Sequence, residues 1–144
     1  MELKFEEHDS SLNIKANIMV LIVWFAPFVL NIFTSIRYLG FIIPIVFLLL
    51  EKKSELVRRH ASQALVINLI QFVLYLVFYV VFASVLFGGF WLFYWFFSGI
   101  FSLVNIGILV IAILQAIKGY QWTYLNLPII GNLAESIEKL VKLN

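Results

Sequence analysis

Few residues in this chain have side chains suited to chemistry, and most of them lie in polar segments. Histidine occurs twice, at positions 8 and 60. His8 stands beside Asp9 in a polar N-terminal segment, where a solvated side chain is the expected role. His60 directly precedes a long uncharged run, so we interpret it as an interfacial anchor or a hydrogen-bonding group at a helix start, in preference to a catalytic base.

No catalytic or metal-binding set can be assembled from these residue types. The acidic residues lie outside the apolar runs, cysteine is absent, and no glycine-rich phosphate loop occurs. We therefore predict no catalytic residues, no metal site and no cofactor, and we predict that the protein is not an enzyme. The net charge of +2 is too small to indicate a nucleic-acid partner.

One short charged segment, EKKSELVRRHASQ at residues 51–63, separates the apolar runs. It is the only charged segment between positions 38 and 117, so we expect it in water at a membrane boundary. Basic side chains in such a place attract anionic lipid headgroups, while arginine can also hold a protein partner through directional hydrogen bonds. The candidate contacts with a partner or a lipid headgroup are Lys52, Lys53, Arg58, Arg59, His60 and Gln63.

Polar side chains also recur at helical spacing inside the apolar runs. Amides that hydrogen-bond between membrane helices contribute about 0.6–2 kcal/mol each. Because no member of the set is charged, we favour interhelical contact over a hydrophilic path. The candidates for interhelical polar contacts are Asn68, Gln71, Ser98, Ser102, Asn105 and Gln115.

The composition indicates a membrane protein. Hydrophobic residues make up 63% of the 144 residues and charged residues 12%, against roughly 45–50% and about 25% in globular domains. A soluble fold of this size buries only about 70% of its chain surface, so it could not hide so much apolar area. We predict an all-α protein that forms a single membrane domain over residues 1–144.

The apolar runs predict four transmembrane helices. Residues 16–50 carry one charge, Arg37, and as a single helix they would reach about 52 Å, far beyond the ~30 Å hydrocarbon core. We therefore place two spans there, near 14–33 and 37–51. The uncharged run 61–117 is interrupted at Gly88-Gly89, which predicts spans near 61–86 and 91–118.

Two further helices are expected outside the spans. Ser10 or Ser11 would cap a short N-terminal helix that leads into the first span. Residues 129–143 alternate apolar and charged side chains at helical spacing, which predicts an amphipathic helix on the membrane interface, with a partner-binding helix as the alternative. Nine of the ten basic residues lie in the termini and the central segment, so an integral, multi-pass protein with both termini cytoplasmic is predicted.

Three motifs resemble a known family. VRRHASQAL at residues 57–65 resembles the V-R-x-H-A-x-Q-A-L signature of the Tic-twenty-like family, small membrane proteins that include a chloroplast inner-envelope translocon subunit and prokaryotic relatives. FIIPIVFLLLEKKS at 41–54, and AIKGYQWTY at 116–124 with Pro128, are similar to its second span and its ending. The resemblance implies a four-helix fold and a prokaryotic plasma membrane as the location.

The signature also suggests roles for the charged segment. We predict that Arg58 and His60 make directional hydrogen bonds, with Gln63 completing the set one turn further on. Arg59 lies outside the signature and should tolerate lysine, whereas Arg58 should not.

The function predicted from these features is a non-enzymatic subunit or assembly factor of a larger membrane complex, in protein translocation or transport. The alternative is an oligomeric channel or carrier lined by the polar side chains of the third and fourth spans. The expected partners are membrane lipids and either another protein or a second copy of this chain. Copurification with a second membrane protein would favour the first function, and ligand-dependent flux from the purified protein alone would favour the second.

Overall fold

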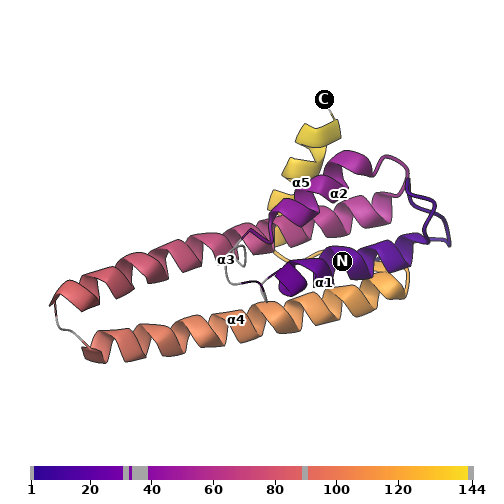
Figure 1. The fold of residues 1–144 in the computed structure, drawn as a ribbon. Coiled ribbons are helices and arrows are strands. Elements are labelled where there is room, and N and C mark those ends of the chain that lie inside the picture. Colours follow the sequence, from indigo (N-terminus) through magenta and orange to yellow (C-terminus); the bar gives the residue numbers. More distant parts are fainter. Residues whose placement is uncertain (1, 31–32, 34–38, 89–90, 143–144) are drawn as a thin grey trace.

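The computed structural model describes residues 2–30, 33, 39–88 and 91–142, which form five helices and a two-stranded sheet (Figure 1). The predicted turn at Arg37 and part of the break at Gly88-Gly89 lie outside the described residues. In chain order the elements are β1 (Glu2–Lys4), α1 (Ala16–Leu30), α2 (Ile42–Leu50), α3 (Glu55–Gly88), α4 (Trp91–Tyr120), β2 (Thr123–Leu125) and α5 (Ile130–Lys142).

Two long antiparallel helices, α3 and α4, form the frame of the molecule. They contain 34 and 30 residues, or about 51 and 45 Å of helix. Figure 1 shows one half of this pair extending away from all other elements. We call this half, residues 76–88 and 91–102, the stalk, and the other described elements with the remaining parts of α3 and α4 the head.

The stalk presents apolar side chains outward. Val80, Leu92 and Phe96 of the stalk are 63%, 86% and 65% exposed. Both helices are long and apolar enough to cross a membrane. Because most of their apolar side chains lie on the outside of the protein, lipid is the solvent that suits them.

The prediction of four spans is wrong for the first two. The predicted spans 61–86 and 91–118 lie within α3 and α4, but α1 and α2 contain only 15 and 9 residues. These lengths correspond to about 22 and 14 Å, short of the ~30 Å core. The apolar side chains that suggested spans near 14–33 and 37–51 are used in part to pack against α3 and α4, because burial in protein and burial in lipid favour the same residue types.

The predicted short N-terminal helix is absent from the described residues. Residues 2–4 form β1, which pairs antiparallel with β2, so that Glu2 lies opposite Leu125 and Lys4 opposite Thr123. The following residues turn instead of coiling: Ser10 Oγ accepts a hydrogen bond from Leu12 N, and Asn13 adopts a φ of 57°. Pairing with a strand more than a hundred residues away overrides the local helix signal.

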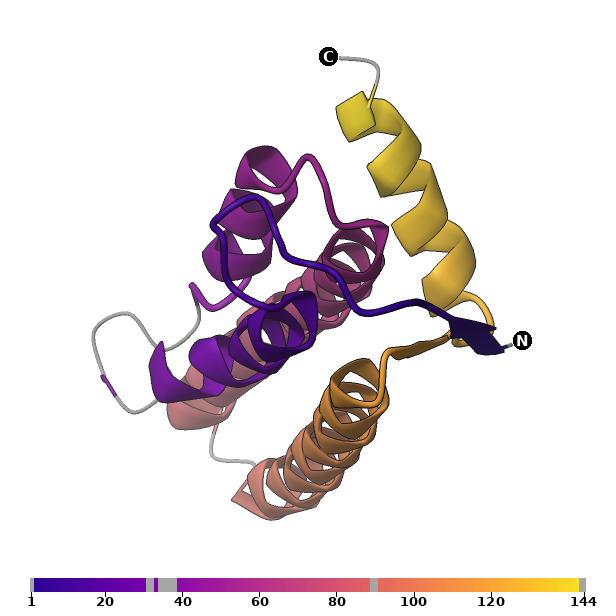
Figure 2. The ribbon, with the colours of Figure 1, turned by 90° about the vertical axis from the view of Figure 1, so that its right-hand side faces the viewer.

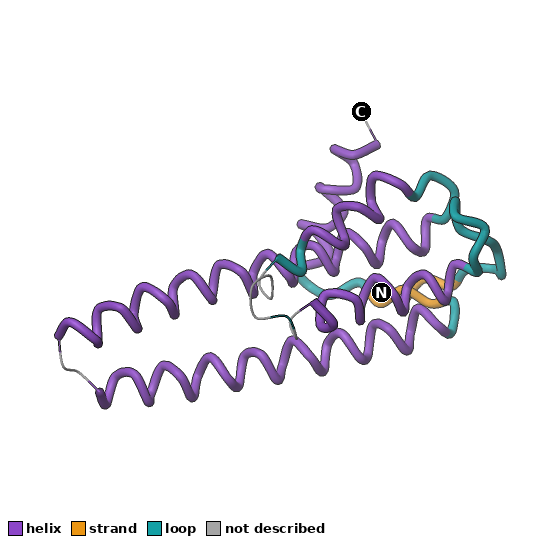
Figure 3. Tube along the Cα trace, viewed as in Figure 1, coloured by secondary structure: helices purple, strands orange, loops and turns teal. Residues whose placement is uncertain are grey.

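The last helix agrees closely with the prediction, since α5 begins and ends within a residue of 129–143. It lies across the first half of α3 and beside α2 (Figure 2). Ala134 and Glu138 face the protein and are buried, while Leu133 and Leu140 are exposed. The connecting segments gather around the same head (Figure 3).

The core of the head is built from α1, α3 and the last turns of α4. Small residues of α3 and α4 allow these helices to approach one another and α1. Gly119 shows the limit, because a Cβ there would lie 2.9 Å from Val20 Cβ and 3.1 Å from His60 Nε2. The fully buried side chains of this core include Met19, Val20, Val23, Trp24, Leu56, Val57, Ala61, Ala64, Ala112 and Ala116.

Candidate functional site

Four of the candidate residues, Arg58, Arg59, His60 and Gln63, lie in the first turns of α3, which carry part of the charged segment. This helix begins after Ser54, whose Oγ accepts a hydrogen bond from Val57 N at 3.2 Å. A serine that satisfies a free N–H at a helix start is a typical cap. The cap sets the helix phase, and His60 and Gln63 then point inward with no exposed surface.

His60 joins three elements through one imidazole ring. Its Nδ1 lies 3.0 Å from Trp24 Nε1 of α1, and its Nε2 lies 3.0 Å from the Thr123 carbonyl oxygen of β2. The Trp24 indole can only donate and the carbonyl can only accept, so the ring is neutral with its proton on Nε2. Both nitrogens are therefore occupied, and the ring serves as a structural hydrogen-bonding group.

Two glutamines bind the same strand two residues further along, at Leu125. Gln63 Nε2 of α3 and Gln115 Nε2 of α4 both donate to the Leu125 carbonyl oxygen, at 3.2 and 2.8 Å. Gln115, predicted as an interhelical contact, therefore binds a strand instead. We call His60, Gln63 and Gln115, with the two carbonyls that they bind, the β2 latch. It fixes the segment that leads from α4 to α5.

The loop between α2 and α3 is covered by the N-terminal segment. The buried Glu51 carboxylate accepts hydrogen bonds from Ser11 N and Oγ, Lys53 N and Ser54 N, at 2.7–3.0 Å. Burial raises the pKa of this carboxyl, but the hydrogen bonds, led by Ser54 N, outweigh it and lower the pKa below its ordinary value of 4.5. Glu51 is thus held as an anion.

His8 is not the solvated side chain that we predicted. Its Nε2 lies 2.7 Å from Ser54 Oγ, and its ring packs against Trp122 with the ring centroids 5.5 Å apart. Ser54 lies 46 residues further along the chain, so the polar sequence around His8 gave no sign of this contact. Together with Ser11, it ties the N-terminal segment to the start of α3.

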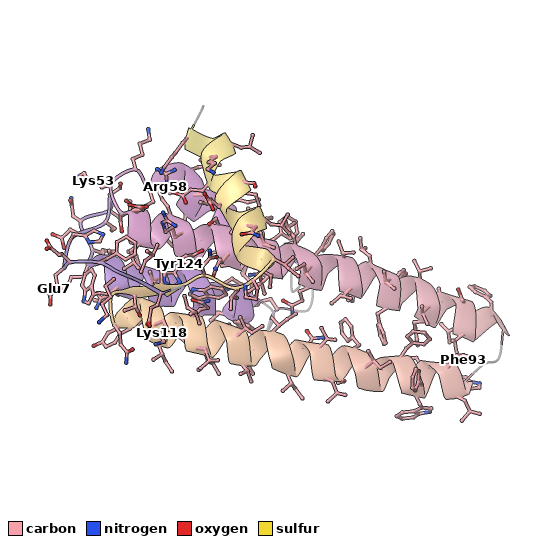
Figure 4. The ribbon with its side chains drawn as sticks, turned by 180° about the vertical axis from the view of Figure 1, so that it is seen from behind. Glu7, Lys53, Arg58, Phe93, Lys118 and Tyr124 are labelled. Carbon is pink, nitrogen blue, oxygen red and sulfur yellow. The ribbon has the colours of Figure 1, made fainter. Side chains whose placement is uncertain are left out.

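The two arginines of the charged segment make different contacts, and the hydrogen bonds predicted for Arg58 are not found at its Nε and Nη2 within the described part of the chain. Arg58 Nη2 lies 3.7 Å from Glu138 Oε1 of α5, and its buried Nε and Nη2 donate no hydrogen bond to any described residue. Arg59 instead uses its fork, since Nε and Nη2 donate to Glu55 Oε1 at 2.9 and 2.7 Å. Its guanidinium also lies 5.7 Å from the Tyr124 ring centroid. Figure 4 shows Arg58 and Tyr124 close to α5.

Of the remaining candidates, the polar residues of α3 and α4 meet at one point. Gln71 Nε2 donates to Asn105 Oδ1 at 2.7 Å, which joins the two helices. Asn68 donates to the Ala64 carbonyl within its own helix. Ser98 is half-buried and Ser102 is exposed. The exposed side chains of Lys52 and Lys53 lie at the loop.

Sequence reasoning missed several residues of the head. Trp24, Ser11 and Thr123 bind partners that are 36 to 63 residues away, and no local pattern marks them. Glu138 did carry a signal, because it lies one turn after Ala134 and three residues before Val141, on the inward face of α5. An acidic residue on such a face predicts a buried cationic partner, which is Arg58.

The described fold is that of a small helical protein with two helices suited to crossing a membrane and a hydrogen-bonded head. A family model described as the magnetosome magnetite crystal formation protein family matches residues 15–133, which is most of the chain. The protein therefore belongs to this family of membrane proteins. No curated protein and no solved structure matches the chain.

The family match overturns the resemblance to the Tic-twenty-like family. The motif that suggested it has a structural use in this fold, because Ala61 and Ala64 are buried against neighbouring helices and His60 and Gln63 hold β2. A short pattern of small and polar residues records how a helix packs. It is a weaker guide to family than a match over more than a hundred residues.

Proposed function

We propose that this protein is a non-enzymatic membrane component that takes part in the formation of magnetite crystals, as a subunit or assembly factor of a larger membrane complex. The observation that carries the proposal is the family match over residues 15–133. The exposed apolar stalk supports a membrane location, with α3 and α4 as the spanning helices.

A non-enzymatic role agrees with how the buried polar groups of the head are used. Both nitrogens of His60, the amide nitrogens of Gln63 and Gln115, and the Glu51 carboxylate bind other parts of the same chain. Groups engaged in this way serve to order the head. A role in protein translocation rested on the Tic-twenty-like resemblance, and the family match removes that basis.

We further propose that the head faces the cytoplasm. Nine basic residues belong to the head and Arg37 lies outside the described residues. Positive charge beside membrane spans favours the cytoplasmic side, and the nine are Lys4, Lys15, Lys52, Lys53, Arg58, Arg59, Lys118, Lys139 and Lys142. Under this orientation both termini are cytoplasmic, and the end of α3 and the start of α4 lie at the opposite face of the membrane.

The test is made in the cells that contain the gene, with the protein tagged at its native level. Vesicles that hold magnetite are separated from other membranes by a magnetic column. We expect the protein to be enriched in the retained vesicles together with at least one other membrane protein, and we expect gene deletion to change the size distribution of the crystals in electron micrographs. Cells without magnetite, or crystals unchanged by deletion, would contradict the proposal.

A channel or carrier is the competing function. The polar residues expected to line such a channel support it weakly. Gln71 and Asn105 bind each other, and Ser102 is exposed on the outside. Purified protein in liposomes distinguishes the two functions. Ion flux above that of protein-free liposomes, lost in the Asn105→Leu variant, would favour a channel over a subunit role.

A further inference from the structure

A cavity lies between the end of α2 and the end of α5, beside the start of α3. It has a volume of about 390 Å³, more than ten times the ~30 Å³ that a water molecule occupies in the liquid. Three cationic side chains line it, from three different elements: Lys52 from the loop, Arg58 from α3 and Lys142 from α5. Tertiary structure therefore brings together charges that are up to 90 residues apart.

Arg58 is the most buried of these cations. Its side chain is only 13% exposed, its nearest carboxylate oxygen is 3.7 Å away, and its Nε and Nη2 donate no hydrogen bond to a described residue. A buried guanidinium with unused donors is uncommon, because its desolvation is normally offset by hydrogen bonds. Planar guanidinium groups bind phosphate oxygens well.

The two carboxylates near the cavity leave room for a further anion. Glu51 already accepts several hydrogen bonds from the N-terminal segment and its own loop. Glu138 Oε1 lies 3.2 Å from Lys142 Nζ and is shared with Arg58. Three cations face two anions, so the formal charge around the cavity is +1.

The rest of the cavity wall is mainly apolar. Leu48, Leu49 and Val141 line it together with Glu51, whose carboxylate is engaged by the hydrogen bonds described above, and Leu49 is largely exposed on α2. On the other side of α5, a second cavity of about 470 Å³ is lined almost wholly by apolar side chains of α3 and α5, among them Val66, Ile70 and Leu140. Cations above an apolar wall match a molecule with an anionic head and a hydrocarbon chain.

We propose that the cavity between α2, α3 and α5 binds the phosphate group of an anionic phospholipid, with Arg58, Lys52 and Lys142 around the phosphate and acyl chains against Leu48, Leu49 and Val141. This site would tie α5 to the membrane surface through a specific lipid. The inference does not depend on the role in magnetite formation.

The experiment titrates purified protein in neutral phosphatidylcholine micelles with phosphatidic acid and follows the melting temperature. A ligand that binds the folded state raises this temperature. We expect a rise with phosphatidic acid and none with added phosphatidylcholine. The Lys52→Gln and Lys142→Gln variants should each weaken the apparent affinity roughly fivefold.

The chain offers a matched control for each variant. Lys53 is the neighbour of Lys52, and Lys139 lies one turn before Lys142 with a similar ion pair to Glu135, but neither lines the cavity. Lys53→Gln and Lys139→Gln should therefore keep the parent affinity. Equal weakening in all four variants would mean diffuse charge attraction and would overturn the site.

Two further arms complete the test. Arg58→Lys keeps the charge but loses the planar fork, so it should weaken the affinity while the fold is retained. Inorganic phosphate and glycerol 3-phosphate are added as soluble competitors at the lipid concentration. Displacement of the lipid by either would show a site for a soluble phosphate, and it would overturn the assignment to a lipid.

Discussion

At the scale of single residues, His60 has the most consequential contacts in the head. It accepts from Trp24 and donates to the Thr123 carbonyl, both at 3.0 Å and both buried. Hydrogen bonds of this kind contribute modestly when made, but a buried partner left without one is costly. His60 therefore acts as a junction of α1, α3 and β2.

Replacement of His60 by Phe should destabilise the protein strongly. The Trp24 N–H and the Thr123 carbonyl would each be left buried without a partner, at about 1–3 kcal/mol apiece. The free energy of unfolding in detergent measures this effect. His8→Phe is the matched control, because His8 is only half-buried, and it should cost less than about 1.5 kcal/mol. Equal losses of stability in the two variants would contradict the role of the two His60 hydrogen bonds in joining α1, α3 and β2.

Glu51 gives the stability a pH dependence with a definite sign. Its pKa is lower in the folded protein than its ordinary value of 4.5. A lowered pKa contributes stability that is fully present above pH 4.5 and is lost as the pH falls through the folded value. Glu51→Gln should therefore lower the melting temperature at pH 7.

The difference between the parent and Glu51→Gln should shrink as the pH is lowered below 4.5, because the unfolded parent takes up the proton there and the folded parent, with its lower pKa, takes it up only at lower pH. Glu7→Gln serves as the surface control, since Glu7 is exposed and its ion pair with Lys15 spans 3.9 Å. Such a pair contributes at most about 1 kcal/mol. A Glu51 effect that stays constant down to pH 3 would contradict the account.

At the scale of elements, the close approach of two helices in the head depends on a glycine, which has no side chain. Gly119 of α4 lies against Val20 of α1 and against the His60 ring. By contrast, Gly107 of the same helix has open space where a Cβ would stand. The two glycines therefore separate the effect of packing from that of helix propensity.

Gly119→Ala should destabilise the head by about 1–3 kcal/mol, because the added methyl group overpacks the α1–α4 contact. Gly107→Ala should be neutral or stabilising by up to about 1 kcal/mol, because alanine is the better helix former and meets no neighbour. Unfolding in detergent, followed by circular dichroism, measures both. The same sign in the two variants would show that α1 does not pack on α4 as described.

The α3–α4 pair is joined by the Gln71–Asn105 hydrogen bond. Asn105→Leu should lower the free energy of unfolding by about 0.6–1.7 kcal/mol, as for other interhelical bonds in membranes. Ser102→Ala, at an exposed position of the same helix, should change it little. If Ser102→Ala costs as much as Asn105→Leu, the hydrogen bond is not the source of the stability.

At the scale of the whole molecule, the head and the stalk suit different surroundings, because the head carries the charged segments and the stalk exposes apolar side chains. The polar segments gather at the head, while the stalk ends at aromatic residues such as Phe93 (Figure 4). In the proposed arrangement, with α3 and α4 crossing the membrane, the charged segments lie on one side of it, and this asymmetry favours a single orientation.

Single cysteines test this orientation, since the chain contains none of its own. The cysteines are placed at exposed positions, because buried serines of the head such as Ser10 and Ser54 would not react. Cysteines at Glu7, Lys53 and Ser136 should react with a membrane-impermeant reagent from the cytoplasmic face. A cysteine at Leu92 should react from the opposite face. Labelling of Lys53 and Ser136 from opposite faces would contradict the two-span arrangement.

The amino-acid sequence by itself determined that apolar helices would need lipid around them, that the fold is helical, and where α5 begins and ends. Composition, an unbroken apolar run and amphipathic spacing are local properties, and they act on the chain wherever it folds. It also separated the basic segments from the spans, because charge is costly in lipid whatever the tertiary arrangement.

Only the tertiary structure decided how many apolar runs form long helices and what the polar residues bind. Hydrophobicity reports transfer out of water, which is equally favourable into lipid and into a protein core, so α1 and α2 looked like spans. Trp24 as the partner of His60, Ser11 as a partner of Glu51, and Glu138 as the partner of Arg58 lie 36 to 80 residues away. A hydrogen bond or ion pair between such distant residues depends on chain topology, so no local pattern identifies the partner, even where the position of Glu138 on the inward face of α5 indicates that a cationic partner exists.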